Sequence, residues 1–146
     1  MNVIIIEDEK PSARRLDRML QSHDIKVNVM LHSVEESLAW FQKNEHPDLI
    51  FLDIQLSDGL SFEIFENIEV KSAIIFTTAY DEYALQAFKL NSIDYLLKPI
   101  DSEELEHAVI KYKERIPERK NVSLDFEDIK KLLIIRLSVA YKNDLP

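Results

Sequence analysis

The stretch LIFLDIQL, residues 49–56, decides the fold of this chain and raises the question of its function. Four apolar residues have the length of a buried β-strand, and they run directly into Asp53 before the sequence turns apolar again. A carboxylate is costly to remove from water unless a cation or hydrogen-bond donors compensate it. A strand that carries a carboxylate to its end therefore predicts a site at that end.

Short apolar runs alternate along the chain with segments of helical periodicity. The apolar runs, mostly β-branched or aromatic, predict five strands, at residues 3–6, 27–31, 49–52, 73–76 and 93–97. Alternating strands and helices favour parallel strands with right-handed crossovers, and nearly continuous apolar strands indicate a sheet covered on both faces. The predicted fold class is α/β, with a five-stranded parallel doubly wound sheet.

Helices are predicted in all four gaps between the strands and after the last strand. Two of them begin at capping boxes, in which Ser33 pairs with Glu36 and Asp101 pairs with Glu104. The helices of the third and fourth gaps rest on apolar residues at helical spacing, namely Leu60, Ile64, Phe65 and Ile68, then Tyr83, Ala84, Ala87 and Phe88. In such a sheet the ligand crevice lies beyond the carboxyl ends of the strands.

The charge balance and the residues missing from the chain exclude several classes of protein. A formal net charge of −9 disfavours binding to nucleic acid or to an anionic membrane. The chain has no cysteine, and its histidines lack metal-ligand spacing, so disulfides and structural zinc are not expected. A single glycine excludes the glycine-rich phosphate loops of dinucleotide and P-loop proteins. The N-terminal apolar run is far shorter than the about 20 residues of a membrane span, so we expect a cytoplasmic protein.

Polar side chains follow four of the five predicted strands. They are carboxylates after the first and third strands, hydroxyls after the fourth and an ammonium group after the fifth, namely Glu7, Asp8, Asp53, Thr77, Thr78 and Lys98. The carboxyl ends of parallel strands share one edge of the sheet, so these groups should converge. Three carboxylates repel one another unless a cation lies among them. Oxygen donors alone favour Mg²⁺, with the backbone carbonyl of Gln55 as a further ligand.

A carboxylate, Mg²⁺, a hydroxyl and a lysine are together suited to covalent phosphoryl transfer. In this interpretation Asp53 attacks phosphorus while Thr78 and Lys98 hold the phosphoryl charge. Each residue also has a plainer reading. The acidic pair could favour a helix N-terminus, Thr78 could be a cap, and Lys98 could be a solvated loop charge. The convergence of all of them at one sheet edge favours the site.

The motifs IIIEDE, FLDIQL, FTTAY and DYLLKP stand in the order and spacing of a response-regulator receiver domain, which the chain resembles over roughly residues 1–116. The segment FTTAYDEYALQAFKLNSIDYLLKPI is most similar to the LytTR (LytR/AlgR-like) subfamily. The resemblance implies the flavodoxin-like (βα)5 fold, strand order 2-1-3-4-5, and a place in a two-component signalling pathway.

The resemblance also implies a role for each site residue. Asp53 is the phosphoacceptor, Thr78 the switch hydroxyl, Tyr95 the switch aromatic residue and Lys98 the phosphate-contacting lysine, while the acidic pair Glu7 and Asp8 binds the metal. The peptide bond before Pro99 would be cis. By this reading the chain is no separate enzyme, because it catalyses only its own phosphoryl transfer and slow autodephosphorylation.

The chain departs from the receiver pattern at two places. Receivers often have a proline four residues after the phosphoacceptor, where this chain has Ser57, and a Gly-Ala pair before the fifth strand, where it has Asn91 and Ser92. Asn tolerates left-handed backbone geometry, so the second turn remains plausible. Neither departure removes a residue of the predicted chemistry.

The expected function is a phosphorylation-activated switch whose partner is a sensor histidine kinase. Phosphorylation should draw Thr78 toward the phosphate and let Tyr95 turn inward, which changes the face of the fourth helix, fifth strand and fifth helix. That face should then favour a homodimer. Its candidate contact residues are Tyr83, Gln86, Lys89, Asp94 and Glu106.

Residues 117–146 are too few for an independent effector fold. We expect a linker and a fragment of a C-terminal DNA-binding domain, through which alone the protein would bind DNA and regulate transcription. The alternative is a stand-alone phosphorelay or protein-interaction receiver without DNA binding. A phosphatase with an aspartate nucleophile is disfavoured, because such enzymes have a DxD pattern and Gln55 leaves no general acid two residues after Asp53.

Overall fold

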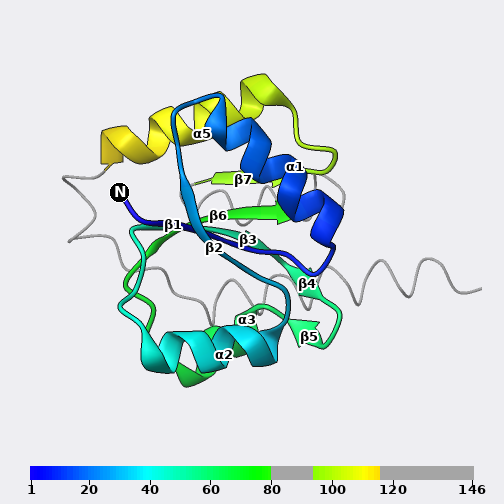
Figure 1. Ribbon diagram of the computed structural model, residues 1–146, viewed down its shortest axis with the longest axis vertical. Coiled ribbons are helices and arrows are strands. Elements are labelled where there is room, and N and C mark those ends of the chain that lie inside the picture. Colours follow the sequence, from blue (N-terminus) through cyan, green and yellow to red (C-terminus); the bar gives the residue numbers. More distant parts are fainter. Residues whose placement is uncertain (80–93, 116–146) are drawn as a thin grey trace, which may run out of the picture.

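The computed structural model describes residues 1–79 and 94–115, and its centre is a five-stranded parallel sheet (Figure 1). The strands are β1 (Val3–Ile6), β2 (Val27–Leu31), β3 (Leu49–Asp53), β6 (Ala73–Thr78) and β7 (Asp94–Leu97). They lie in the order β2-β1-β3-β6-β7 and are paired in parallel throughout. Counted along the chain, these five strands have the order 2-1-3-4-5, so the predicted fold class and strand order are confirmed.

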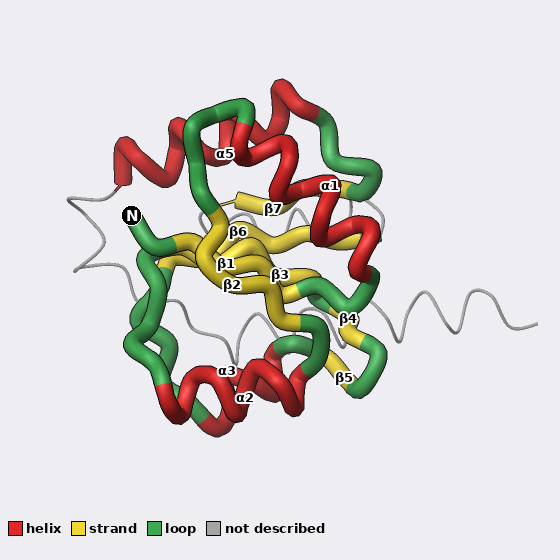
Figure 2. Tube along the Cα trace, in the orientation of Figure 1, coloured by secondary structure: helices red, strands yellow, loops and turns green. Residues whose placement is uncertain are grey.

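Helices cover both faces of the sheet, which makes three layers. The helices α1 (Lys10–Gln21) and α5 (Ser102–Arg115) lie on one face, and α2 (Val34–Lys43) and α3 (Phe62–Asn67) lie on the other (Figures 1 and 2). The strands β1, β3 and β6 are buried along their whole length. Their position inside the sheet explains why their sequences are apolar without alternation.

Each face of the sheet packs into its own apolar core. Val3 and Ile5 of β1 belong to the core under α1 and α5, whereas Ile4 and Ile6 belong to the core under α2 and α3. Successive side chains of a strand point to opposite faces, so one continuous apolar run supplies both cores. The rigid centre of the sheet holds the carboxyl ends of the strands in fixed register.

The N-caps of the two predicted capping boxes are present at α2 and α5. Ser33 Oγ accepts a hydrogen bond from the Glu36 amide at 3.0 Å, and Asp101 Oδ2 accepts one from the Glu104 amide at 3.1 Å. The Glu36 carboxylate reaches one residue beyond the cap, because its Oε2 accepts from the backbone amide of His32 at 3.1 Å. These bonds satisfy amides that the first turn of a helix leaves without intrahelical partners.

The prediction for the third gap was wrong in its extent. Helix α3 covers only Phe62–Asn67, and a small antiparallel hairpin precedes it, formed by β4 (Gln55–Leu56) and β5 (Gly59–Leu60). Leu60 therefore belongs to β5, and Ile68 follows the helix. Strands of two residues show no periodicity, which is why the apolar residues of the hairpin fitted a helical pattern.

Gly59 allows the hairpin to form. Its φ of 150° lies in a region that side chains rarely adopt, and a Cβ atom there would lie 2.6 Å from Glu63 Oε2. The turn between the two short strands consists of Ser57 and Asp58, so the missing proline of the receiver pattern falls in this turn. The only glycine of the chain thus shapes the loop that follows Asp53.

Several predictions fall outside the described residues. They concern the helix of the fourth gap, the turn at Asn91 and Ser92, and the tail 117–146. The contact residues Tyr83, Gln86 and Lys89 lie in the same undescribed range, 80–93. Within residues 1–79 and 94–115, no helix is long and apolar enough to cross a membrane.

Candidate phosphoacceptor and metal site

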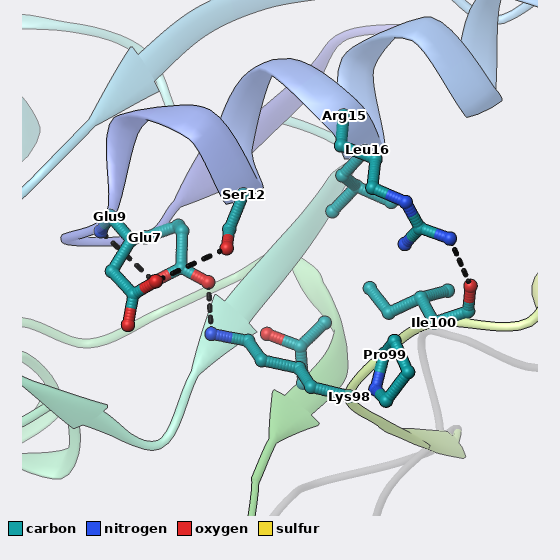
Figure 3. A pocket seen from close by; sticks show the side chains of 9 residues that line it. Glu7, Glu9, Ser12, Arg15, Leu16, Lys98, Pro99 and Ile100 are labelled. Atoms are coloured by element: carbon teal, nitrogen blue, oxygen red, sulfur yellow. Dashed lines mark hydrogen bonds and ion pairs between the residues drawn. The ribbon is translucent and has the colours of Figure 1, made fainter.

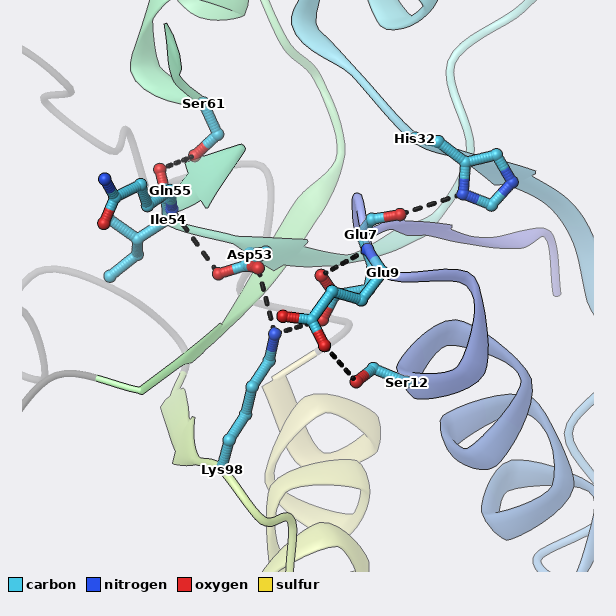
Figure 4. A network of polar contacts seen from close by, with 9 residues as sticks. All are labelled: Glu7, Glu9, Ser12, His32, Asp53, Ile54, Gln55, Ser61 and Lys98. Atoms are coloured by element: carbon cyan, nitrogen blue, oxygen red, sulfur yellow. Dashed lines mark hydrogen bonds and ion pairs between the residues drawn. The ribbon is translucent and has the colours of Figure 1, made fainter. Parts of the chain in front are cut away.

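Three strands deliver the charged side chains of the site to one edge of the sheet. Glu7 follows β1 directly, Asp53 is the last residue of β3, and Lys98 follows β7 directly. Both carboxylate residues are almost fully buried, since Glu7 is 4% exposed and Asp53 6%. The structure therefore brings together side chains that stand 45 and 91 residues from Lys98 in the sequence (Figure 4).

Lys98 is the counter-charge of the two buried carboxylates. Its Nζ donates a hydrogen bond to Asp53 Oδ2 at 2.9 Å and another to Glu7 Oε1. The backbone amide of Lys98 donates to the Thr78 carbonyl at 2.8 Å, which fixes the start of the side chain beside β6. The peptide bond before Pro99 is cis, as predicted. Lys98 is thus not a solvated loop charge.

The acidic pair and Asp53 form a cluster suited to a divalent cation. Glu7, Asp8 and Asp53 each offer a carboxylate oxygen, and these oxygens lie within 4.8 Å of one another. The donors are all oxygens, the set that Mg²⁺ prefers, and Asp8 is more accessible to solvent than the other two. These residues fit the predicted ion. Gln55 donates its backbone amide to Asp53 Oδ1 at 3.4 Å, so its carbonyl, the predicted further ligand, belongs to the same loop.

Burial and the closeness of like charges shift the pKa values of the site. Burial raises the pKa of Glu7, neighbouring Asp53 raises it further, and hydrogen bonds with Asp8 and Lys98 offset only part of the increase. Burial and the proximity of Glu7 also raise the pKa of Asp8. Burial lowers the pKa of Lys98, but the carboxylates of Glu7 and Asp53 outweigh this effect and raise it overall. One ammonium group compensates three carboxylates incompletely, so a divalent cation would be favoured.

We expect Glu7→Gln to stabilise the metal-free protein at neutral pH. A carboxyl group with a raised folded-state pKa stabilises the fold fully below its unfolded value, near 4.5, and this contribution is lost as the pH rises through the folded pKa. The Glu7→Gln variant has no such loss, so its advantage in the free energy of unfolding should grow as the pH rises above 4.5 and level off above the raised pKa of Glu7. Urea unfolding with chelator at several pH values measures this. An advantage that does not change with pH would contradict the prediction.

The two predicted switch residues lie on one face of the sheet. Thr78 ends β6 and is 1% exposed, and Tyr95 in β7 is half-buried. In the register of these strands Tyr95 pairs with Phe76 and Leu97 with Thr78, and Tyr95 packs against the core under α2 and α3. Because side chains alternate, Thr78 and Tyr95 face the same side. This placement is compatible with a coupled movement, and their roles stay predictions.

A pocket of about 350 Å³ opens beside the site, between α1 and the loop after β7 (Figure 3). Its lining includes Glu7, Thr77 and Lys98 at the strand ends and residues of α1. Arg15 Nη2 donates to the Ile100 carbonyl at 3.0 Å across the pocket. The sequence did not single out Arg15, because its partner lies 85 residues away and an exposed basic residue on a helix carries no signal of its own.

Sequence reasoning also missed two side chains that hold the loops of the site. His32 Nδ1 contacts the Glu7 carbonyl at 2.9 Å, and the carboxylate of Asp58 binds the first amides of α2. An Asp-Gly pair is a turn signal, so the turn at Asp58 could have been found in the sequence. The contact of Asp58 with α2 could not have been found in the sequence.

A parallel sheet with acids and a lysine at its carboxyl edge is the arrangement that the sequence motifs predicted for a receiver domain. The family model of the response regulator receiver domain matches residues 3–110, so the chain belongs to this family. The chain is also similar to a solved two-component response regulator from Clostridium difficile, with 28% identity, a TM-score of 0.66, and coverage of 80% of this chain and 98% of that one.

Several relatives of this chain are regulators of the LytT and LytR type. It is 39% identical over 119 residues to the sensory transduction protein LytT of Bacillus anthracis. The matched region is 79% of this chain and 48% of LytT. The chain is 37% identical over 116 residues to the transcriptional regulatory protein LytR of Staphylococcus aureus. The matched region is 76% of this chain and 46% of LytR. The predicted LytTR subfamily is confirmed, and the chain spans about half the length of these relatives.

Proposed function

We propose that this chain is a phosphorylation-activated switch in which Asp53 accepts a phosphoryl group from a sensor histidine kinase. The observation that carries the proposal is the meeting of three carboxylates within 4.8 Å with the Lys98 ammonium, in a chain of the receiver family. Membership of this family implies interaction with a histidine kinase. In this proposal Asp53 itself carries the phosphoryl group, so the chain acts as a phosphoacceptor and not as a separate enzyme.

The chemistry is an in-line transfer to a buried carboxylate. One oxygen of Asp53 forms a bond to phosphorus while the bond from phosphorus to the donor nitrogen breaks, and the electron pair stays on that nitrogen. Lys98 moves its hydrogen bond from Asp53 to a phosphoryl oxygen, and the Thr78 hydroxyl donates to another. Glu7, Asp8, Asp53 and the Gln55 carbonyl would hold Mg²⁺, which would supply positive charge beside the phosphoryl oxygens. Attack of water on the acylphosphate slowly restores the free carboxylate.

Intact-mass measurement tests the function. The purified chain is incubated with Mg²⁺ and a small phosphodonor such as acetyl phosphate, and a parallel sample contains a chelator. The mass of one phosphoryl group should appear only in the sample with free Mg²⁺, because the carboxylates otherwise repel the anionic donor. A chain that gains no phosphoryl mass under either condition would refute the proposal.

We further propose that the signal leaves through the face to which β7 and α5 belong, the face for which the sequence also predicts a helix in the fourth gap, outside the described residues. On its described part, Lys111 Nζ lies 3.8 Å from Asp94 Oδ2, Glu106 is exposed, and Ile110 of α5 is 44% exposed. Mixed charge around an exposed apolar side chain suits a two-fold contact with a second copy. A rearrangement of Thr78 and Tyr95 would change this face.

The beryllofluoride-bound form is therefore expected to self-associate more strongly than the unmodified form. A coupling free energy of about 1–3 kcal/mol corresponds to an increase of about 5- to 150-fold in the association constant. Sedimentation with and without the mimic measures both constants. Glu106→Lys should weaken the mimic-induced dimer, whereas Glu45→Lys, a matched charge reversal in the exposed loop after α2, should not. Equal constants for both forms would exclude this route of output.

For the whole protein, we propose a receiver at residues 1–116, followed by a linker and the start of a DNA-binding domain within 117–146. The support is the length of the relatives, of which this chain spans about half, and the description of one of them as a transcriptional regulatory protein. Dimers of the receiver would then bring two DNA-binding domains to paired half-sites in the cytoplasm. The negative charge of this chain is consistent with DNA binding by another domain only.

A further inference from the structure

The three carboxylates of the site come from two loops that are separate in the sequence. Glu7 and Asp8 follow β1, whereas Asp53 begins the loop that continues through Asp58. Both loops hydrogen-bond to the same segment, residues 32–36, where β2 ends and α2 begins. We call this segment the β2-α2 junction.

His32 connects the junction to the acidic pair (Figure 4). Its Nδ1 lies 2.9 Å from the carbonyl oxygen of Glu7, and since a carbonyl only accepts, Nδ1 carries the proton and donates. The backbone amide of His32 donates to Glu36 Oε2 at 3.1 Å, which holds the residue against the first turn of α2. The Glu7 amide donates to the Leu31 carbonyl at 2.9 Å, so both backbone groups of Glu7 are bound by the end of β2.

Asp58 connects the junction to the loop that follows Asp53. Its Oδ1 accepts from the Val34 amide at 2.8 Å, and its Oδ2 accepts from the Glu35 amide at 3.0 Å. These two amides, with that of Val34 foremost, hold the pKa of the Asp58 carboxyl below its usual range. Since Ser33 already binds the amide of Glu36, Asp58 is an additional cap that reaches α2 from another loop.

We propose that the β2-α2 junction is a clamp that keeps the two metal-binding loops together, with His32 and Asp58 as its positioning residues. This inference rests on the proposed function and deepens it. The pairing of Ile6 with Leu52 fixes the strand ends, but Asp8 and the residues after Asp53 lie beyond that pairing. Without a cation the three carboxylates repel one another, so these residues would be displaced and would have to be reordered when the ion binds. The clamp opposes that displacement. Groups that orient metal ligands from outside the coordination shell typically change metal affinity by about 10- to 100-fold when removed.

The test is Mg²⁺ titration of the full chain, followed through backbone amide shifts, which needs no phosphorylation. His32→Ala and Asp58→Ala should each weaken Mg²⁺ binding by about 10-fold or more, since each releases one loop. His32→Asn should restore most of the Mg²⁺ affinity. The side-chain nitrogen of Asn is bonded to Cγ, as Nδ1 of His is, so it can donate to the same Glu7 carbonyl. Asn44→Ala is the matched control. It removes a bond from Asn44 Nδ2 to the Trp40 carbonyl at 2.9 Å, at the opposite end of α2, and should leave Mg²⁺ affinity unchanged.

Two outcomes would overturn the clamp. One is wild-type Mg²⁺ affinity in both His32→Ala and Asp58→Ala. The other is an equal loss in Asn44→Ala, which would mean that the affinity follows the stability of α2 and not the tethers. Failure of the proposed function looks different, because the wild-type chain itself would then bind no Mg²⁺ and form no acylphosphate.

Discussion

Asp53→Asn is expected to reduce acylphosphate formation to the level of a sample without phosphodonor. The amide has nearly the shape of the carboxylate but is a far weaker nucleophile, and it withdraws one charge from the metal cluster. The fold should persist, because the Asn side chain can still accept a hydrogen bond from Lys98 at the place where Asp53 Oδ2 now lies, 2.9 Å from Nζ. Intact mass after incubation with Mg²⁺ and acetyl phosphate measures the loss.

Asp48→Asn is the control for this experiment. Asp48 stands just before β3, at the opposite end of the strand from Asp53, where its Oδ2 accepts from the Asn2 amide at 2.7 Å. The same chemical change at that end should leave labelling intact. Equal phosphoryl mass in wild type and Asp53→Asn would show that another residue is modified. Labelling that chelator leaves unchanged would refute the metal cluster.

Lys98→Met is expected to destabilise the metal-free protein by about 2–3 kcal/mol. The substitution keeps the length of the side chain but leaves Glu7 and Asp53, 4% and 6% exposed, without their shared counter-charge. Removing one partner of a fully buried ion pair typically costs about 3–5 kcal/mol, and we expect less here because the Lys98 side chain is 21% exposed. Urea unfolding in the presence of chelator measures the change, with Lys26→Met, at an exposed lysine, as control.

Mg²⁺ should largely restore the stability of Lys98→Met. An ion at 100 times its dissociation constant stabilises the folded state by about 2.7 kcal/mol, close to the expected loss. Since the cation no longer competes with an ammonium group for Glu7 and Asp53, the variant should bind Mg²⁺ at least as tightly as the wild type. Phosphorylation should nevertheless fall, because no lysine holds the phosphoryl group. A variant that binds Mg²⁺ more weakly than wild type would contradict this account of Lys98.

The sequence alone determined the fold and the place of the site. Five apolar runs separated by helical segments leave a parallel sheet as the consistent arrangement, and in such a sheet the strands all end at one edge. The residues directly after the strands therefore had to meet, and Glu7, Asp53 and Lys98 do. The N-caps at Ser33 and Asp101 were equally predictable, because each cap bond joins residues only three positions apart.

Other features could not be predicted from local sequence patterns. The hairpin of β4 and β5 is too short to show a period, so Leu60 was assigned to a helix that begins only at Phe62. The switch movement, in which Thr78 moves toward the phosphate and Tyr95 turns inward, remains a prediction drawn from the family resemblance. The contact residues Tyr83, Gln86 and Lys89 lie outside the described residues and remain predictions as well.

Only the tertiary structure decided how the loops of the site are held. Lys98 pairs with Glu7 and Asp53 at once, His32 binds a carbonyl 25 residues away, and Asp58 caps a helix that begins 24 residues before it. Strand ends follow from periodicity, because every βα unit repeats the same geometry. Contacts between loops have no period. They depend on the distances that the packed sheet and helices impose, and these distances exist only once the chain has folded.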